Sequence, residues 1–166
     1  IKAINDEYEE WVRDNTKKNA DKELAALKDN TDKTIAQRIA DNEKIKQLAI
    51  GAANIDYNNE VAGFKKAQQD KLDALKEAKD KELALYEGNG PKQKEINEKY
   101  AAEEVLLQNQ TDAKIVQSNQ DKNDKITAAN KEALKTDKEL QQERLDNIAD
   151  VIGKIAQQIS AAGDVI

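Results

Sequence analysis

Residues 61–91 read VAGFKKAQQDKLDALKEAKDKELALYEGNGP, and this stretch contains both features that decide the fold. Pairs of large apolar residues recur in it, each an i, i+3 step and each eleven residues after the last: Val61/Phe64, Leu72/Leu75 and Leu83/Tyr86. Eleven residues make three turns at about 3.67 residues per turn, which is close to the natural α-helix. The pattern predicts a long, nearly straight helix with one narrow packing seam.

The second feature is the run Gly88-Asn89-Gly90-Pro91 at the end of this stretch. Gly88 can take the left-handed conformation that ends a helix, and Pro91 suits the first turn of the next one. Asn89 or Gly90 can serve as the N-cap between them. We predict a turn over 88–91, with one helix ending near residue 87 and the next beginning near residue 91. So short a connection favours an antiparallel helical hairpin.

The composition predicts an all-α fold of long helices and coiled coil, which we expect to be oligomeric. Charged residues make up 36% of the 166 residues, aromatic residues only 4%, and the mean hydropathy is -0.92. These proportions suffice for seams between helices but not for the broad core of a compact domain. The net charge of -6 is spread evenly, without the basic cluster that direct nucleic-acid recognition needs.

Around the turn, the apolar spacing predicts a long helix over 1–50, a helix over 64–87 and a returning helix over 92–144. For residues 51–63 the sequence leaves two alternatives open, a break and a continuous helix. Gly and Asn lower helix propensity there by up to about 1 kcal/mol each relative to Ala. The apolar residues Ile50, Ile55 and Val61 could nevertheless continue one helical face.

The last segment, 145–166, has a different period and starts an apolar region. Large residues alternate at steps of three and four, as in the a and d positions of a heptad: Leu145, Ile148, Ile152, Ile155, Ile159 and Ile166, with Ala162 between the last two. This seam predicts a left-handed coiled coil, and isoleucine at both positions favours trimers or tetramers in parallel coils. We therefore expect a homo-oligomer, with a trimer favoured.

Reactive chemistry finds little support in the sequence. With no His and no Cys, a catalytic or metal site would have to rest on carboxylates, Lys or Tyr, which here lie on helix faces patterned for water. Gly88-Asn89-Gly90 lacks the Gly-Lys-Ser/Thr of a phosphate loop. We expect no enzyme activity, no cofactor and no metal.

The chain has no Met and starts Ile-Lys-Ala-Ile, so we expect a processed product or an excerpt of a longer protein. It shows no signal peptide and no apolar stretch of about 18 residues that could span a bilayer.

Three features resemble phage tail tape measure proteins and their counterparts in contractile injection systems. They are the segment KQKEINEKY at 92–100 after a short turn, the Asp-Lys-Glu-Leu units at 21–24, 80–83 and 137–140, and the change to Ile/Ala/Gly-rich sequence at Ile148–Ile166. The resemblance implies a structural virion protein that occupies the tail lumen or tip, sets tube length and is ejected at infection. It implies tail tube or tail-tip proteins as partners and membrane contact by the C-terminal apolar region. A hairpin shortens the reach of this region and suits the tail tip better than the extended ruler.

Two other interpretations remain open. An amphipathic lipid-surface or membrane-surface binder, as an extracellular or cytoplasmic soluble protein, fits the apolar stripes, although Lys and Arg are not concentrated at their edges. A largely disordered desiccation-type helix former fits the high polarity, although regular Ile and Leu seams indicate packed partners.

Overall fold

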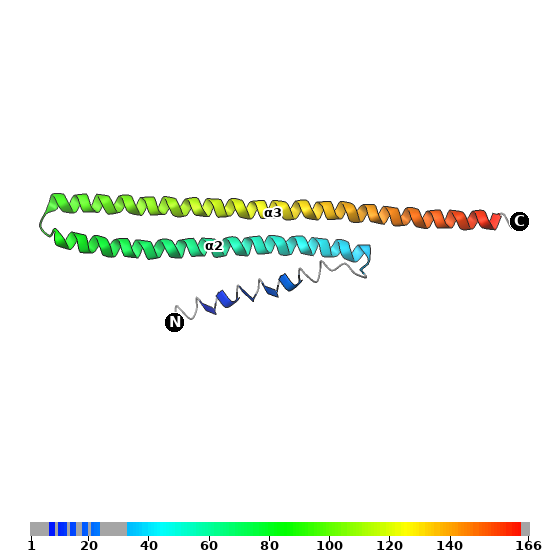
Figure 1. The fold of residues 1–166 in the computed structure, drawn as a ribbon, viewed down its shortest axis with the longest axis horizontal. Coiled ribbons are helices and arrows are strands. Elements are labelled where there is room, and N and C mark those ends of the chain that lie inside the picture. The colour runs from blue at the N-terminus through cyan, green and yellow to red at the C-terminus, as the bar shows by residue number, and fades with distance from the viewer. Residues whose placement is uncertain are drawn as a thin grey trace. The chain divides into compact units, whose positions relative to one another are not determined.

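The computed structural model describes residues 7–8, 10–12, 14–15, 18–19, 21–23 and 33–163, with side chains up to residue 157. Two long helices make up most of this part, α2 (Ile35–Leu85) of 51 residues and α3 (Gly90–Gly163) of 74 residues (Figure 1). They lie side by side and antiparallel, and no strand occurs among the described residues. The predictions of an all-α fold and a helical hairpin are confirmed.

The chain divides into two compact units, to which both helices contribute. The turn unit is Ala53–Asp124 and contains the connection between the helices. The end unit combines Ile1–Ala52 with Lys125–Ile166. Each unit holds its own contacts between α2 and α3, and each is described separately below.

In the turn unit, the connection has the chemistry that its residues predict. Gly88 has a φ of 80°, in the left-handed region that glycine enters without steric cost. Asn89 is the N-cap of α3, because its Oδ1 accepts a 3.2 Å hydrogen bond from the Lys92 amide and its carbonyl accepts one from Gln93 at 2.9 Å. The helices end at Leu85 and begin at Gly90, one or two residues from the predicted boundaries.

The predicted single helix over 1–50 needs a correction in the end unit. Lys33 and Thr34 are not helical, and α2 begins at Ile35. Thr34 caps this helix by accepting a hydrogen bond from the Gln37 amide at 3.2 Å. Thr34 is thus the N-cap residue, which explains why the helix starts here. Gln37 completes the Thr-x-x-Gln sequence pattern of a capping box, but its side chain donates to Asp41.

Residues 51–63, where a break remained open, are helical throughout and belong to α2. Neither Gly51 nor Gly63 has a positive φ. Ala53 is buried at 4% exposure within this segment, so packing against α3 supports the helix where propensity is weak. Of the two alternatives that the sequence left open, the structure shows the continuous helix.

Burial along α3 follows the eleven-residue period more strictly than the sequence suggests. All seven buried residues in the described part of α3 fall in two rows, and the members of each row are eleven residues, or a multiple of eleven, apart. One row holds Ile96, Leu107, Ser118 and Leu140, and the other holds Tyr100, Thr111 and Ala133. The period that the sequence shows in α2 thus also governs its partner helix, where small and polar residues occupy several positions.

Candidate interaction surfaces

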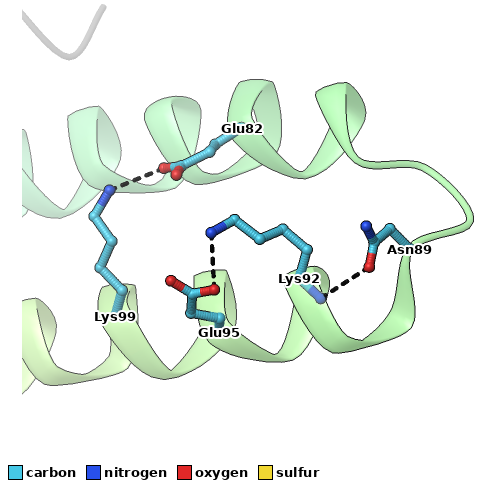
Figure 2. Close-up of polar contacts among 5 residues, drawn as sticks. All are labelled: Glu82, Asn89, Lys92, Glu95 and Lys99. Carbon is cyan, nitrogen blue, oxygen red and sulfur yellow. Dashed lines mark hydrogen bonds and ion pairs between the residues drawn. The ribbon is translucent and has the colours of Figure 1, made fainter.

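A polar cluster next to the turn joins the two helices (Figure 2). Glu82 of α2 accepts a hydrogen bond from Lys99 Nζ at 3.0 Å, which Figure 2 shows. It also accepts one from the Tyr100 hydroxyl at 2.9 Å. The bond from Lys99, then that from Tyr100, lowers the pKa of the Glu82 carboxyl. The same carboxylate raises the pKa of Lys99 and of Tyr100, chiefly through these hydrogen bonds. All three groups are satisfied by one another, so the cluster fixes the helices and leaves no free acid or base.

Lys92 and Glu95 form a second pair on the first turns of α3, with Nζ and Oε2 2.8 Å apart (Figure 2). The hydrogen bond to Glu95 raises the pKa of Lys92. Lys92 Nζ also lies 5.8 Å from the centre of the Tyr86 ring, within the range of a cation–π contact. Tyr86, predicted as a seam residue, is exposed at 38% and contacts this lysine from the end of the seam.

Polar residues also cross the seam farther from the turn, still within the turn unit. Ser118, which is buried, donates a hydrogen bond to Glu60 across the helices. Lys122 Nζ lies 4.5 Å from the centre of the Tyr57 ring, and Lys114 Nζ lies 5.8 Å from that of Phe64. Each of these side chains comes from the opposite helix to its partner. They align α2 and α3 in one register.

In the end unit, a buried amide and one ion pair join α2 to α3. Asn42, 6% exposed, donates from Nδ2 to the Ala133 carbonyl at 2.9 Å and to Asp137 Oδ1 at 2.7 Å. Arg38 Nη1 contacts both carboxylate oxygens of Glu143 at 2.9 Å.

Asp41, the most deeply buried carboxylate of this unit, lies one residue before Asn42. It accepts hydrogen bonds from Lys33 Nζ at 2.9 Å and Gln37 Nε2 at 3.0 Å, and the bond from Lys33, then that from Gln37, lowers the pKa of its carboxyl. Like the cluster at the turn, these groups pair with one another and position α2.

None of these clusters has the composition of a reactive centre. Among the described residues, no group of three or more carboxylates lies close enough together to hold a metal ion. Within the same residues, no helix is apolar enough over a sufficient length to cross a membrane.

A hollowed surface lies in the turn unit, where α2 and α3 form the two walls of an open groove of about 450 Å³. Lys71, Ala74 and Leu75 come from α2, and Glu103, Leu106 and Leu107 come from α3. The floor is apolar. Leu107 is buried at 8% exposure, whereas Leu106 is 57% exposed within the groove. We call this surface the Leu106 groove.

The predicted seam residues divide into two groups. Those of the turn unit lie half-buried between the helices, apart from Tyr86: Val61, Phe64, Leu72, Leu75 and Leu83. Those of α3 past Glu143 are exposed at 48–61%: Leu145, Ile148, Ile152 and Ile155. Val151, exposed at 56%, widens this face. The side chain of Ile159 and all of Ile166 lie outside the described residues.

The structure also places residues that the sequence prediction missed. Leu106 stands in the run Val105-Leu106-Leu107, whose apolar character is evident in the sequence, but a run of three covers too much of the helix circumference to show which member faces the partner. Lys71 and Glu103 belong to mixed-charge stretches that carry no signal of their own.

The fold and these surfaces define a class of protein, an antiparallel helical hairpin with an eleven-residue repeat and apolar faces on its surface. Comparison with protein-family models, with curated proteins and with solved structures gave no match.

Proposed function

We propose that this chain is a structural segment of a phage tail tape measure protein, or of its counterpart in a contractile injection system. The observation that carries the proposal is the hairpin itself. It is a pair of long helices whose buried rows repeat every eleven residues and whose polar side chains, such as Asn42 and Glu82, pair across the two helices. Such a surface can pack along other rods or a tube wall, and it offers no sheltered reactive group.

In this role the chain's helices fill space. An α-helix rises about 1.5 Å per residue, so a helical protein converts chain length into occupied tube length. A hairpin doubles the number of helices in cross-section and halves the reach. This suits a position at the tail tip, next to tip and tube proteins, in preference to the extended part of the ruler.

The exposed face of α3 supports a further part of this proposal, the assembly of three parallel copies. Leu145, Ile148, Ile152 and Ile155 keep the three-four alternation of a coiled coil and are exposed in the single chain. Isoleucine at both core positions favours three or four strands over two in parallel coils.

The test is to detect the polypeptide that carries this sequence in its native source, with an antibody against the turn unit. We expect a polypeptide far above 18.5 kDa that sediments with tail particles and is released from them when infection is triggered. A polypeptide near 18.5 kDa that stays in the soluble fraction would contradict the tape-measure proposal.

The alternative is an amphipathic lipid-surface protein, favoured by the same exposed face, Leu145 to Ile155, with Val151 beside it. Flotation with vesicles of neutral and of anionic lipid separates the two functions. Flotation of the chain, lost on changing Ile152 and Ile155 to Asp, would favour lipid binding. Sedimentation without the vesicles would favour the structural role.

A further inference from the structure

We propose that the Leu106 groove is an interface between copies of this chain, and that the copies pack parallel to one another about a rotation axis that runs along the helices. In this arrangement, α2 of one copy lies against α3 of the next. The inference goes beyond the proposed function, because it would hold for any role of the hairpin.

The first argument is the incomplete cover of the seam. A helix pair encloses its seam from two sides only, so the residues next to the contact stay partly open. In the turn unit, this leaves Leu106 57% exposed and Leu75 half-buried along one apolar groove. Covering these open apolar side chains by a second chain would remove them from water, which is favourable.

The second argument is the charge on the two walls. Lys71 stands on the α2 wall and Glu103 on the α3 wall, and among the described contacts neither forms an ion pair. An axis along the helices places the α2 wall of one copy against the α3 wall of its neighbour, so that Lys71 meets Glu103. An axis across the helices would place α2 on α2 and bring the two lysines together. Opposite charges therefore select the parallel arrangement.

The same charges disfavour a lipid surface as the occupant. Binding to anionic headgroups needs Lys or Arg along both edges of an apolar face. Here one edge of the groove carries a carboxylate, and the net charge of the chain is -6. A copy of the chain supplies both the apolar surface and the complementary charges.

The experiment uses the full chain with Ile152→Asp and Ile155→Asp, which remove the C-terminal face as a source of self-association. We expect this background to remain self-associated in sedimentation equilibrium. Adding Leu106→Asp should weaken association at least tenfold, as for the loss of a central apolar contact. The matched control is Val105→Asp, one residue away and 60% exposed, but outside the groove; it should leave association unchanged.

Charge reversal tests the orientation in the same background. Lys71→Glu and Glu103→Lys should each weaken association roughly two- to fivefold, as expected for one exposed ion pair. The double reversal should restore it. A background that is monomeric at all concentrations would overturn the proposal, and so would equal effects of Leu106→Asp and Val105→Asp.

Cross-linking gives an independent readout, because the chain has no Cys. Chains with Lys71→Cys, labelled with 15N, are mixed with unlabelled chains carrying Glu103→Cys and treated with a short bismaleimide. We expect mixed-mass dimers to form faster than dimers of either variant alone. Equal yields in the mixed and single-variant samples would contradict the parallel arrangement and leave the proposed function untouched.

Discussion

Replacing Asn42 by alanine tests whether buried polar contacts hold the end unit together. Asn42 is 6% exposed and donates to the Ala133 carbonyl at 2.9 Å and to Asp137 Oδ1 at 2.7 Å. A hydrogen bond between neutral groups contributes about 1 kcal/mol, and one to a carboxylate about 1.5–3 kcal/mol. Asp137 is half-buried and regains water when the amide is removed, so the lower values apply. We expect Asn42→Ala to lower the free energy of unfolding by about 2 kcal/mol.

The assay is urea unfolding followed by circular dichroism at one fixed protein concentration, because self-association shifts apparent stability. In a thermal scan, about 2 kcal/mol corresponds to a decrease in Tm of roughly 4–8 °C for a chain of this size. The matched control is Asn54→Ala, an exposed asparagine of the same helix, which should change stability by less than about 0.5 kcal/mol. Equal effects of the two substitutions would refute the reasoning.

Three further predictions concern the stability of the fold at low pH, the turn and the C-terminal face. The pKa of Glu82 is lowered in the folded state, so the ionised carboxylate contributes to the free energy of unfolding near neutral pH, and this contribution is lost as the pH falls below about 4. The urea midpoints of Glu82→Gln and of the unmodified chain should therefore differ at pH 7 and converge near pH 3. Gly88→Ala should cost about 1 kcal/mol in urea unfolding because φ is positive, whereas Gly90→Ala should cost nothing; equal costs would contradict the role of the left-handed residue. The pair Ile152→Asp and Ile155→Asp should reduce the sedimentation coefficient of the full chain if the face assembles copies, and an unchanged value would contradict the coiled-coil seam.

The turn and the period of α2 could be predicted because both are local properties of the sequence. Glycine can take the left-handed conformation of Gly88 without help from neighbouring residues. The large apolar residues from Val61 to Leu83 mark one face of the helix by their size and spacing alone. The start of α2 carried an equally local signal in Thr34 and Gln37, which match the sequence pattern of a capping box and of which Thr34 forms the N-cap. The prediction of one helix over 1–50 rested on apolar spacing and did not use that signal.

The seam of α3 was harder to see because its positions are occupied by residues of every kind. Thr111 is 6% exposed, in the row that holds Tyr100 and Ala133. Ser118 is 5% exposed, in the row that holds Leu107 and Leu140. A search for large apolar residues passes over them. Their burial depends on the partner helix, which supplies Glu60 as the hydrogen-bond acceptor for Ser118, and a single-helix pattern does not contain that information.

These polar positions explain how a repetitive hairpin keeps one alignment. Because the rows recur every eleven residues, a shift of α3 along α2 by one repeat places seam positions opposite seam positions again, so the period alone does not fix the alignment. The polar pairs are not repeated. A shift would remove Asp137 from Asn42 and would separate Glu82 from Tyr100, leaving buried polar groups without partners.

A single polar residue in an otherwise apolar seam is known to select register in coiled coils at some cost in stability. Asn42 occupies such a position, in the row that continues with Ala53, Phe64 and Leu75 at steps of eleven. Asn42→Leu should therefore act differently from Asn42→Ala: it adds apolar contact and should restore most of the lost stability, but it should broaden the range of alignments. Distances between spin labels at exposed positions on α2 and α3 of the end unit measure this directly. One narrow distance distribution in the leucine variant would show that the turn alone sets the register, and a broadened one would assign that role to the buried amide.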